Sequence, residues 1–552
     1  MKRALLITLA LNFSVLFIFS QDTLPRYWIK FSNKNNSIFT LDDPQLYISD
    51  RAIQRRLKQN IELDSLDLPV SQSYIQSVLS SGEITFWGAS KWLNGIIVKT
   101  TDTIALDSIA NYSFVDNLIQ IKSSSQLKSK IDKFNNFIQG DQKLSVFNTP
   151  NYPFGVCYRQ HNLHHADLVQ QLGLTGNNVH IAILDAGFKD VDQTPALEHL
   201  FSENKILSTF DFVRKETSVF EDHYHGEAVL SIIAGYDPGY YVGSASGASF
   251  HLLISEDVFS ETLVEEYYWV VAAEYADSAG VDVINTSLGY TVFDDSTTNH
   301  SYSEMDGNTT VAAKGLNIAA SKGILCVTSA GNSGSNAWKY ISTPADADFG
   351  LTVGAVDSNG LRAFFSSQGP SFDGDIKPNV MSVGWNTYYI PPASAYASQG
   401  NGTSFSAPMI TGMVAALWEA MPSLTNLELM HLVELYSNNY ANPDSLIGYG
   451  IPDVFQLLLD NSNYGALVDF SEKIKNVFPN PFSDQVTVFY NCENSSQIDV
   501  SLISLTGEQL HQQFFSIEKG LNKLVVELNQ VYSSGIYFLV IEDEVIKLIK
   551  SN

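Results

Sequence analysis

Cysteine is scarce in this sequence, and its scarcity excludes two kinds of architecture. The 552 residues include only three cysteines, Cys157, Cys326 and Cys492. They are too few and too scattered for a disulfide framework or a cysteine-ligated zinc site. Cys326 lies inside the apolar run GILCVTSA, so we expect an ordinary buried thiol there.

Basic residues are also few. Lysine and arginine number 32 against 59 aspartates and glutamates, which gives a formal net charge of −27 at pH 7. A surface of this sign repels phosphate groups, which argues against nucleic acid or an anionic membrane as a partner. Acidity of this kind instead suits solubility outside a cell.

Long apolar runs are absent after the N-terminus. The chain begins MKRALLITLALNFSVLFIFSQD, with Lys2 and Arg3 before an apolar stretch and the small residue Ser20 at a plausible cleavage point. This pattern predicts a secretory signal peptide over residues 1–20. No later run is long enough for a membrane helix, so we expect an exported mature protein without a transmembrane helix.

Three of the remaining segments differ in their patterning. Residues 22–122 alternate short strand-like and helix-like pieces, which predicts a small α+β unit. The polar segment 123–154 shows no core pattern and predicts an exposed linker where processing takes place. Residues 476–552 contain alternating strands such as QVTVFY and NKLVVEL between turns, which predict a small all-β sandwich.

The central segment, residues 155–460, alternates buried-strand runs with helical patterns. The strand runs are VHIAILDAG, VDVINTSLG, GILCVTSAGN and GLTVGAV. Between the first two, Leu263, Tyr267, Val271 and Tyr275 are spaced four apart along one helix face. This order predicts an α/β fold with a mostly parallel sheet and helices on both faces, with ligands at the carboxyl ends of the strands.

Residues 400–418, GNGTSFSAPMITGMVAALW, place one serine at the start of a predicted helix. An apolar stripe begins at Ile410, and Pro408 fits only near a first helical turn. The hydroxyl of Ser404 then lies beside free backbone N–H groups and the positive end of the helix dipole. A helix cap is the commoner role of such a serine, so this stretch alone leaves both cap and nucleophile open.

A nucleophilic serine needs a base to accept its proton and an acid to orient that base. His225 opens the helical pattern HGEAVLSIIAG, with His223 as a competing base, and Asp185 ends the strand VHIAILDAG. Asn332 in SAGNSG follows a buried strand, where its amide could donate to an oxyanion. Each residue also has a structural explanation, as a core histidine, a capping aspartate or a turn asparagine.

Together these stretches resemble the subtilisin-like serine proteases, or subtilases, in the order Asp, His, Asn, Ser. The likeness rests on ILDAGF, HGEAVLSIIAG, SAGNSG and GTSFSAP, and it covers about residues 155–460. It implies a subtilisin-like fold and a serine endopeptidase with Ser404 as nucleophile, His225 as general base and acid, and Asp185 orienting the imidazole. Asn332 would hold the oxyanion.

The resemblance also implies substrate-binding residues. Ser287, Leu288 and Gly289 match the strand along which the family pairs an extended substrate backbone. Ala330 and Gly331 would help to wall the pocket for the residue before the cut bond.

Two positions depart from the family pattern. Ala186 stands where threonine or serine usually follows the aspartate, which removes a possible hydrogen bond to the carboxylate. Glu227 stands where threonine usually follows His-Gly. We expect its charge to favour the imidazolium form and to raise the pKa of His225.

The flanking segments resemble known companions of the family. Residues 22–122 look like an inhibitory prodomain, so the chain's own prodomain is an expected intramolecular partner beside protein and peptide substrates. Residues 476–552, with VFPNPFSDQVTV, LTGEQL and GIYFLVI, resemble the C-terminal sorting domain of type IX secretion. An adhesion module of the same size is the alternative. The implied location is secreted or at the cell surface, reached through that secretion machinery.

The implied chemistry requires no cofactor. Calcium is common in the family, and Asp294, Asp295, Glu304 and Asp306 could contribute oxygen ligands. No stretch has the spacing of an EF-hand, so the sequence assigns no metal ligand.

Two other functions compete with that of a peptidase. An inactive binding or adhesion protein on the same scaffold is suggested only by Ala186 and Glu227. A lipase or esterase of the α/β-hydrolase type needs a G-x-S-x-G elbow and the order Ser, acid, His, and the chain has neither around Ser404.

Overall fold

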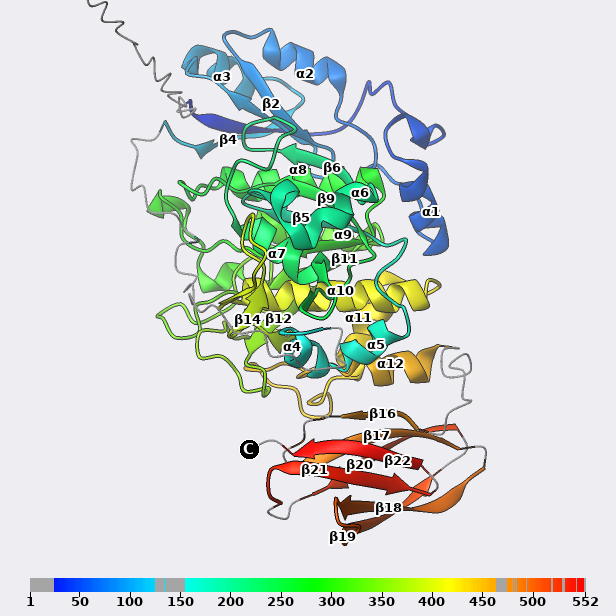
Figure 1. The fold of residues 1–552 in the computed structure, drawn as a ribbon. Helices are drawn as coiled ribbons and strands as arrows, with labels where there is room; N and C mark the ends of the chain where they lie inside the picture. The colour runs from blue at the N-terminus through cyan, green and yellow to red at the C-terminus, as the bar shows by residue number, and fades with distance from the viewer. Residues whose placement is uncertain are drawn as a thin grey trace, which may run out of the picture.

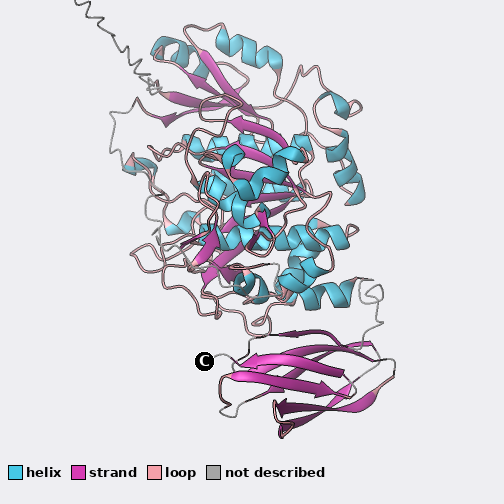
Figure 2. Cartoon of the chain, in the orientation of Figure 1, coloured by secondary structure: helices cyan, strands magenta, loops and turns pink. Residues whose placement is uncertain are grey.

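The computed structural model describes residues 24–124, Phe134, residues 154–462 and most positions between 474 and 550. The predicted signal peptide and most of the predicted linker lie outside these described residues. Figure 1 shows an N-terminal unit and a C-terminal all-β unit at opposite ends of a large central domain, and Figure 2 shows the division of helices and strands among them.

The N-terminal unit is a small α+β fold, as predicted. Its antiparallel sheet has the order β2-β3-β1-β4. The strands are β1 (Arg26–Phe31), β2 (Thr85–Ser90), β3 (Gly95–Lys99) and β4 (Val115–Lys122), and the helices are α1 (Asp50–Lys58), α2 (Gln72–Leu79) and α3 (Thr103–Ala110). Because side chains alternate along a strand, Ile29 and Val98 pack with Val78 of α2 and Ile109 of α3, whereas Trp28 points to the other face.

The central domain is built on a parallel sheet of seven strands in the order β13-β12-β11-β10-β5-β9-β6. The strands are β5 (His180–Asp185), β6 (Ile206–Asp211), β9 (Ser249–Ile254), β10 (Val283–Thr286), β11 (Leu325–Ser329), β12 (Gly350–Val356) and β13 (Val380–Val383). Every pairing between neighbours is parallel. All carboxyl ends therefore meet at one edge of the sheet, where the predicted site residues follow the strands.

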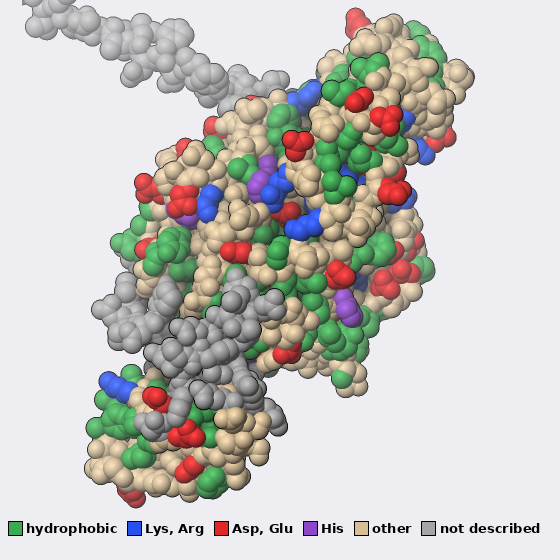
Figure 3. Space-filling model, turned by 90° about the vertical axis from the view of Figure 1, so that its right-hand side faces the viewer, with side chains coloured by type: hydrophobic (Ala, Val, Ile, Leu, Met, Phe, Trp, Pro, Cys, Tyr) green, Lys and Arg blue, Asp and Glu red, His purple; other side chains and the backbone are tan. Residues whose placement is uncertain are grey.

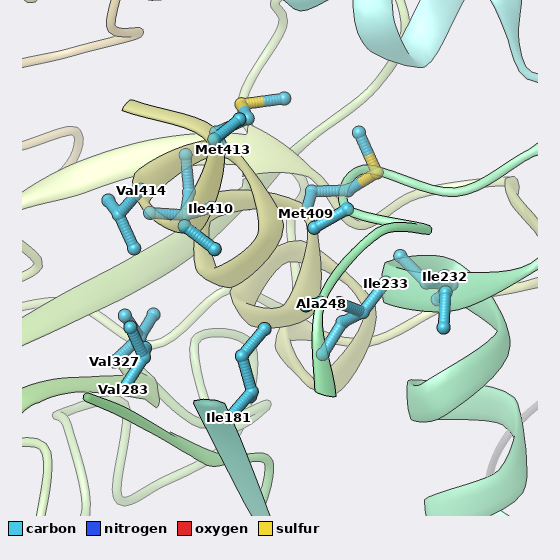
Figure 4. Close-up of a cluster of buried hydrophobic side chains, with 14 of the residues drawn as sticks. Ile181, Ile232, Ile233, Ala248, Val283, Val327, Met409, Ile410, Met413 and Val414 are labelled. Carbon is cyan, nitrogen blue, oxygen red and sulfur yellow. The ribbon is translucent and has the colours of Figure 1, made fainter. Parts of the chain in front are cut away.

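Helices cover both faces of this sheet. On one face lie α7 (His225–Ala234) and α10 (Thr403–Ala420), and on the other lie α8 (Val264–Ala279) and α9 (Val311–Ser321). Figure 4 shows Ile410 and Val414 of α10 above Val283 and Val327, which come from the central strands. The helix is buried from Thr403 to Trp418, so its N-terminus is held rigidly against the strand ends.

The apolar stripe predicted on α8 has an unexpected partner. Tyr267 of the stripe packs with Trp28 of β1, with ring centroids 4.9 Å apart, and so faces the N-terminal unit. The sheet is instead contacted by Trp269 and by the small residues Ala272, Ala273 and Ala276. The helix is therefore apolar on two sides because it is covered on two sides.

Buried charges also join the N-terminal unit to α8. Asp277, which is fully buried, lies 2.5 Å from Arg55, 2.8 Å from Arg56 and 3.1 Å from Lys91. Burial alone would raise the pKa of Asp277, but the charges of Lys91, Arg55 and Arg56 outweigh burial and hold that pKa well below its usual range. We call Arg55, Arg56, Lys91 and Asp277 the clamp.

A second acid of α8 accepts hydrogen bonds from the turn between β2 and β3. Glu274 accepts from the hydroxyl of Ser90 and from the backbone N–H groups of Lys91, at 2.8 Å, and Trp92, at 3.0 Å. Burial raises the pKa of Glu274 to about 7, although Lys91 and these hydrogen bonds act in the opposite direction.

Helix α1 extends the interface to the amino ends of the central strands. Arg51 pairs with Asp282, the residue before β10. Gln59 donates to the carbonyl of Gly323 at 2.8 Å, just before β11. These contacts lie at the edge of the sheet opposite the predicted site, because all seven strands run the same way.

The C-terminal unit consists of two antiparallel sheets, β16-β17-β20 and β19-β18-β21-β22. The strands are β16 (Ile474–Phe478), β17 (Gln485–Cys492), β18 (Ser496–Ser504), β19 (Gln509–Ile517), β20 (Gly520–Glu527), β21 (Gly535–Ile541) and β22 (Glu544–Lys550). Val488 of one sheet and Leu502 and Leu539 of the other share one core, as expected for a sandwich.

The remaining helices and strands are short and complete the central domain. They are α4 (Tyr158–Asn162), α5 (Ala166–Gln171), α6 (Glu198–Ser202), β7 (Tyr236–Asp237), β8 (Tyr241–Val242), β14 (Thr387–Tyr389), β15 (Ser398–Gly400), α11 (Asn426–Leu435) and α12 (Val454–Asn461). Among the described residues, no helix combines the length and apolar character needed to cross a bilayer. On the face in Figure 3, acidic side chains are dispersed over the described surface rather than gathered in one patch.

Candidate active site

Asp185 and His225 form a buried pair at the carboxyl edge of the sheet. Asp185 is the last residue of β5, and His225 is the first residue of α7. Nδ1 of His225 lies 2.6 Å from Oδ1 of Asp185, and both side chains are about 1% exposed. His223 has a different task, because its Nδ1 accepts the backbone N–H of His225 at 3.2 Å. Of the two histidines, His225 is therefore the one joined to the carboxylate.

Ser404 is the second residue of α10, close to the predicted helix start. Its hydroxyl donates to the carbonyl of Ser287 at 3.0 Å, and its own carbonyl accepts from the Ser287 hydroxyl at 3.1 Å. The second bond has a physical reason. Pro408, expected in the first turn, lies deeper in the helix and has no N–H for the carbonyl four residues earlier, so Ser287 supplies the missing donor.

Asn332 lies three residues after β11, with its side chain at the surface. Its amide oxygen accepts two hydrogen bonds from Thr403, one from the backbone N–H at 2.8 Å and one from the hydroxyl at 3.1 Å. Because the oxygen is anchored, the amide NH₂ is directed away from Thr403 and is available as a donor. Thr403, the residue directly before Ser404, thus connects Asn332 to the start of α10. The only feature of the sequence that pointed to Thr403 is its place in GTSFSAP.

The predicted substrate-binding residues lie on two neighbouring strand ends. Ser287, Leu288 and Gly289 follow β10, and Ala330 and Gly331 follow β11. A hydroxyl that the sequence did not single out lies between the two segments. A Cβ at Gly289 would stand 2.2 Å from Oγ of Ser342, and one at Gly331 would stand 3.2 Å from the same atom. A side chain at position 289 would therefore displace the hydroxyl of Ser342.

Alanine at position 186 bears on the hydrogen bonds of the Asp185 carboxylate. The backbone N–H of Ala186 donates to Oδ1 of Asp185 at 2.7 Å, the same oxygen that faces His225. Oδ2 of Asp185 is buried and has no hydrogen-bond partner in the described structure. A hydroxyl at position 186, which alanine lacks, is the kind of group that could satisfy this oxygen.

Glu227 lies in surroundings that disfavour the charge expected of it. Its side chain is fully buried and accepts from the hydroxyl of Thr194 at 3.2 Å. Burial raises the pKa of Glu227 well above its usual value, with a further contribution from the charge of Asp190. Burial therefore disfavours the charged form of this carboxyl group, which removes support for the expected effect of its charge.

Phe134 covers the candidate site. Its ring centroid lies 4.6 Å from that of His225 and 5.3 Å from that of His223, and the side chain is 8% exposed. Phe134 belongs to the segment 123–154, which the sequence presents as an exposed linker. At this residue the segment is instead packed onto the imidazole that is paired with Asp185.

Three groups of acids bring oxygens within 4.8 Å of one another in the described residues. They are Asp211, Glu216 and Asp222; Glu256, Glu261 and Glu265; and Asp348, Asp373 and Asp375. None contains the acids that the sequence offered as calcium ligands. In the first group Arg214 already supplies a cation beside Asp222. Exposed acids often gather without an ion, so a structural calcium remains only an expectation.

The structure therefore gathers the predicted residues at one edge of the sheet, supplied by the ends of β5, β10 and β11 and by the first turns of α7 and α10. A carboxylate, an imidazole, a hydroxyl and an amide in this arrangement have the groups needed for acyl transfer.

Comparisons with known proteins match each of the three units. A family model described as the subtilase family, peptidase S8, matches residues 176–450. A model of the S8 propeptide domain of Bacteroidota matches residues 26–136, and a model of a secretion system C-terminal sorting domain matches residues 476–551.

Individual relatives match the central domain. Subtilisin DY from Bacillus licheniformis is 30% identical over 280 residues, which are 50% of this chain and 90% of that protein. A subtilisin from Bacillus pumilus is 28% identical over 292 residues, 52% of this chain and 94% of that protein. The solved structure of MycP1 from Mycobacterium smegmatis matches with 22% identity and a TM-score of 0.45, over 57% of this chain and 87% of its own.

Proposed function

The chain belongs to the subtilase family of serine peptidases, and on that premise we propose that Asp185, His225 and Ser404 form the catalytic triad of a secreted endopeptidase. The observation that carries the proposal is the 2.6 Å contact between His225 and Asp185 at the strand edge that also holds Ser404. The pair fixes the tautomer of the imidazole, because Nδ1 donates to the carboxylate and leaves Nε2 as the acceptor.

The triad acts on a peptide bond in two steps. The hydroxyl of Ser404 turns from the Ser287 carbonyl to Nε2 of His225 and gives up its proton as Oγ attacks the scissile carbonyl. The imidazolium then protonates the leaving amine, and an acyl-enzyme remains. Water, deprotonated by the same Nε2, releases the acyl group and restores Ser404.

Asn332 stabilises the oxyanion of each tetrahedral intermediate. Its amide oxygen is held by Thr403, so the NH₂ group needs no reorganisation when the charge develops. Ser404 also lies at the positive end of the dipole of α10, which adds to the stabilisation. No cofactor is needed for these steps.

An extended peptide binds along Ser287, Leu288 and Gly289 by adding a strand beside them. The side chain before the cut bond enters between this segment and the segment of Ala330 and Gly331. Protein and peptide substrates fit such a site, because recognition runs mainly through the backbone.

The chain is made as a latent precursor. The S8 propeptide match supports an intramolecular inhibitor, and Phe134 over His225 supplies the physical obstruction. Activity then requires a cut within about residues 123–155. The sorting-domain match supports export through a dedicated secretion system to the surface or the medium.

A catalytically weak binding protein is the second candidate, and one observation favours it. The buried Oδ2 of Asp185 has no hydrogen-bond partner in the described structure, which raises the free energy of the carboxylate that must stabilise the imidazolium.

A serine-directed fluorophosphonate separates the two candidates. We expect the processed protein to be labelled on Ser404, and Ser404→Ala to take up no label. Ser335→Ala is the matched control, because Ser335 is an exposed serine three residues after Asn332. Processed protein that remains unlabelled while still folded would favour the binding protein.

A further inference from the structure

A buried polar network lies beneath the candidate site, between β10 and α10. Its members are Asn285 of β10, Ser287 just after β10 and Thr411 of α10, and none of them is more than 1% exposed. Asn285 is an exception on its face of the sheet, because its partners in the neighbouring strands, Ile183 and Val327, belong to the apolar core. A buried polar side chain is costly unless it is hydrogen-bonded, so packing alone does not explain this asparagine.

Three hydrogen bonds connect the network to Ser404. The hydroxyl of Thr411 donates to Oδ1 of Asn285 at 2.8 Å, and Nδ2 of Asn285 donates to Oγ of Ser287 at 3.1 Å. The hydroxyl of Ser287 donates in turn to the carbonyl of Ser404 at 3.1 Å. Within α10 this carbonyl has no donor four residues later, because that residue is Pro408. The backbone of the proposed nucleophile therefore depends on a side chain from another element.

The direction of these bonds follows from counting donors. The NH₂ group of Asn285 can only donate, so it leaves the hydroxyl proton of Ser287 for the carbonyl of Ser404. With the amide turned round, its oxygen would compete for that proton. Thr411 stays bonded in either case, because its hydroxyl also lies 3.0 Å from the carbonyl of Ala407. Only the observed arrangement reserves a donor for the Ser404 carbonyl, and in it Thr411 is the donor to the amide oxygen.

Ser287 also holds the reactive hydroxyl, because its carbonyl accepts from Oγ of Ser404 at 3.0 Å. We propose that Asn285 and Thr411 are positioning residues for peptide hydrolysis, which orient the Ser287 hydroxyl and so fix the backbone of Ser404 for attack. The inference rests on the proposed peptidase function and adds two buried residues outside the triad. Because a nucleophile displaced by about 1 Å can react about 100-fold more slowly, the network should act on kcat rather than on KM.

Substitutions that remove or keep one hydroxyl test the proposal. Thr411→Val leaves the amide oxygen of Asn285 with the Ser287 hydroxyl as its remaining donor in the network. We expect kcat of the processed protein to fall by about 10-fold to 100-fold, KM to stay within about twofold, and fluorophosphonate labelling of Ser404 to slow in proportion. Thr411→Ser keeps the hydroxyl and should restore most of kcat. Variants that process themselves slowly are cut by an added protease.

Thr328→Val is the matched control. Thr328 is fully buried in β11, and its hydroxyl has no hydrogen-bond partner in the described structure. Its side chain lies on the face of the sheet away from α10, because the adjacent Val327 packs in the core on the α10 side. We expect kcat of this variant to stay within about twofold of wild type. Thermal melting checks that each variant is folded, and Thr411→Ala, which removes the same hydroxyl, replaces Thr411→Val if the latter does not fold.

A double-mutant cycle separates positioning from a merely structural role. If Thr411 acts through the Ser287 hydroxyl, adding Thr411→Val to Ser287→Ala should lower kcat no further than Ser287→Ala does alone. Losses that multiply in the double mutant overturn the inference. An active wild-type protein in which Thr411→Val changes kcat no more than Thr328→Val does overturns this inference alone. Wild-type protein that neither hydrolyses peptides nor takes up the label overturns the proposed function.

Discussion

Beside the apolar contact of Trp28 with Tyr267, the segments that precede the peptidase domain contact it at two places of opposite character. At the carboxyl edge of the sheet, one aromatic ring, Phe134, rests on His225. Along α8, the clamp buries three cations around Asp277, and α1 reaches on to the amino edge. The first contact places an aromatic ring over the imidazole that is paired with Asp185. The second consists of paired charges that are costly to separate.

The difference indicates that different residues cover the candidate site and hold the N-terminal unit on the peptidase domain. A ring contact contributes about 1 kcal/mol, too little to keep a unit of this size in place. Buried ion pairs add little net stability but make any arrangement that breaks them unfavourable. We therefore expect mutations at the candidate site to change catalysis, and mutations at the clamp to change retention of the N-terminal unit.

The largest effect is expected at the candidate site. His225→Ala should lower kcat of the processed enzyme by about 10⁶-fold, the size of the loss known for subtilisin when its histidine is removed. His223→Ala should cost only a few-fold, because His223 contacts the backbone of His225 and not Asp185. Steady-state kinetics on a peptide substrate measures both. The reverse ranking would transfer the role of base to His223.

Breaking the clamp should give the next largest effect, on stability. Asp277→Ala leaves Arg55 and Lys91 buried without this counter-charge and leaves Arg56 with Asp67 as its partner, and we expect the precursor to lose about 3–5 kcal/mol. Denaturant unfolding of the Ser404→Ala precursor measures the loss without self-cleavage. Lys58→Ala, at an exposed position on α1, the helix that carries Arg55 and Arg56, is the control. A loss below about 1 kcal/mol at Asp277 would mean that the clamp does not hold the unit.

The stability of the precursor should also depend on pH, through Glu274 beside the clamp. Its pKa is about 7 in the precursor and near 4.5 when the chain is unfolded, so the folded state retains a proton that the unfolded state releases. Stability should therefore fall as the pH rises from about 4.5 to 7, by up to about 3 kcal/mol, and stay level above. Unfolding of Ser404→Ala with and without Glu274→Gln isolates this effect. A pH-independent difference between the two proteins would contradict it.

The smallest effect is expected at the covering ring. Phe134→Ala should speed fluorophosphonate labelling of the unprocessed chain by a few-fold to about tenfold, because the ring that covers His225 is removed. Phe134→Leu keeps an apolar side chain at this position, so its labelling rate should lie between the rates of the wild-type chain and Phe134→Ala. The stability of the precursor should change by no more than about 1 kcal/mol. A loss of stability as large as that of Asp277→Ala would mean that Phe134 also holds the precursor together, which contradicts the separation of the two roles.

Much of the fold was predictable because local patterns determine it. The parallel sheet followed from runs such as VHIAILDAG, and the S8 and sorting-domain resemblances are confirmed. The order Asp185, His225, Asn332 and Ser404 placed these residues at strand and helix ends, where the structure has them. Their catalytic roles stay predictions, as do the domain boundaries.

What the sequence could not give depends on contacts between distant segments. The stripe on α8 indicated a buried face, but not that the N-terminal unit buries it. The charge of Glu227 depends on burial against Thr194, which no pattern near position 227 reveals. Phe134 lies in a polar segment whose few apolar residues show no periodicity, so nothing local signals its contact with a histidine 91 positions later.

The most direct test of the central claim follows activity and intact mass together during maturation. We expect wild-type protein to gain peptide hydrolysis as it loses the N-terminal unit through a cut within about residues 123–155, and Ser404→Ala to remain inactive even after the same cut is made by an added protease. Hydrolysis by the cut Ser404→Ala protein, or full activity in a chain that still carries its N-terminal unit uncut, would contradict the account.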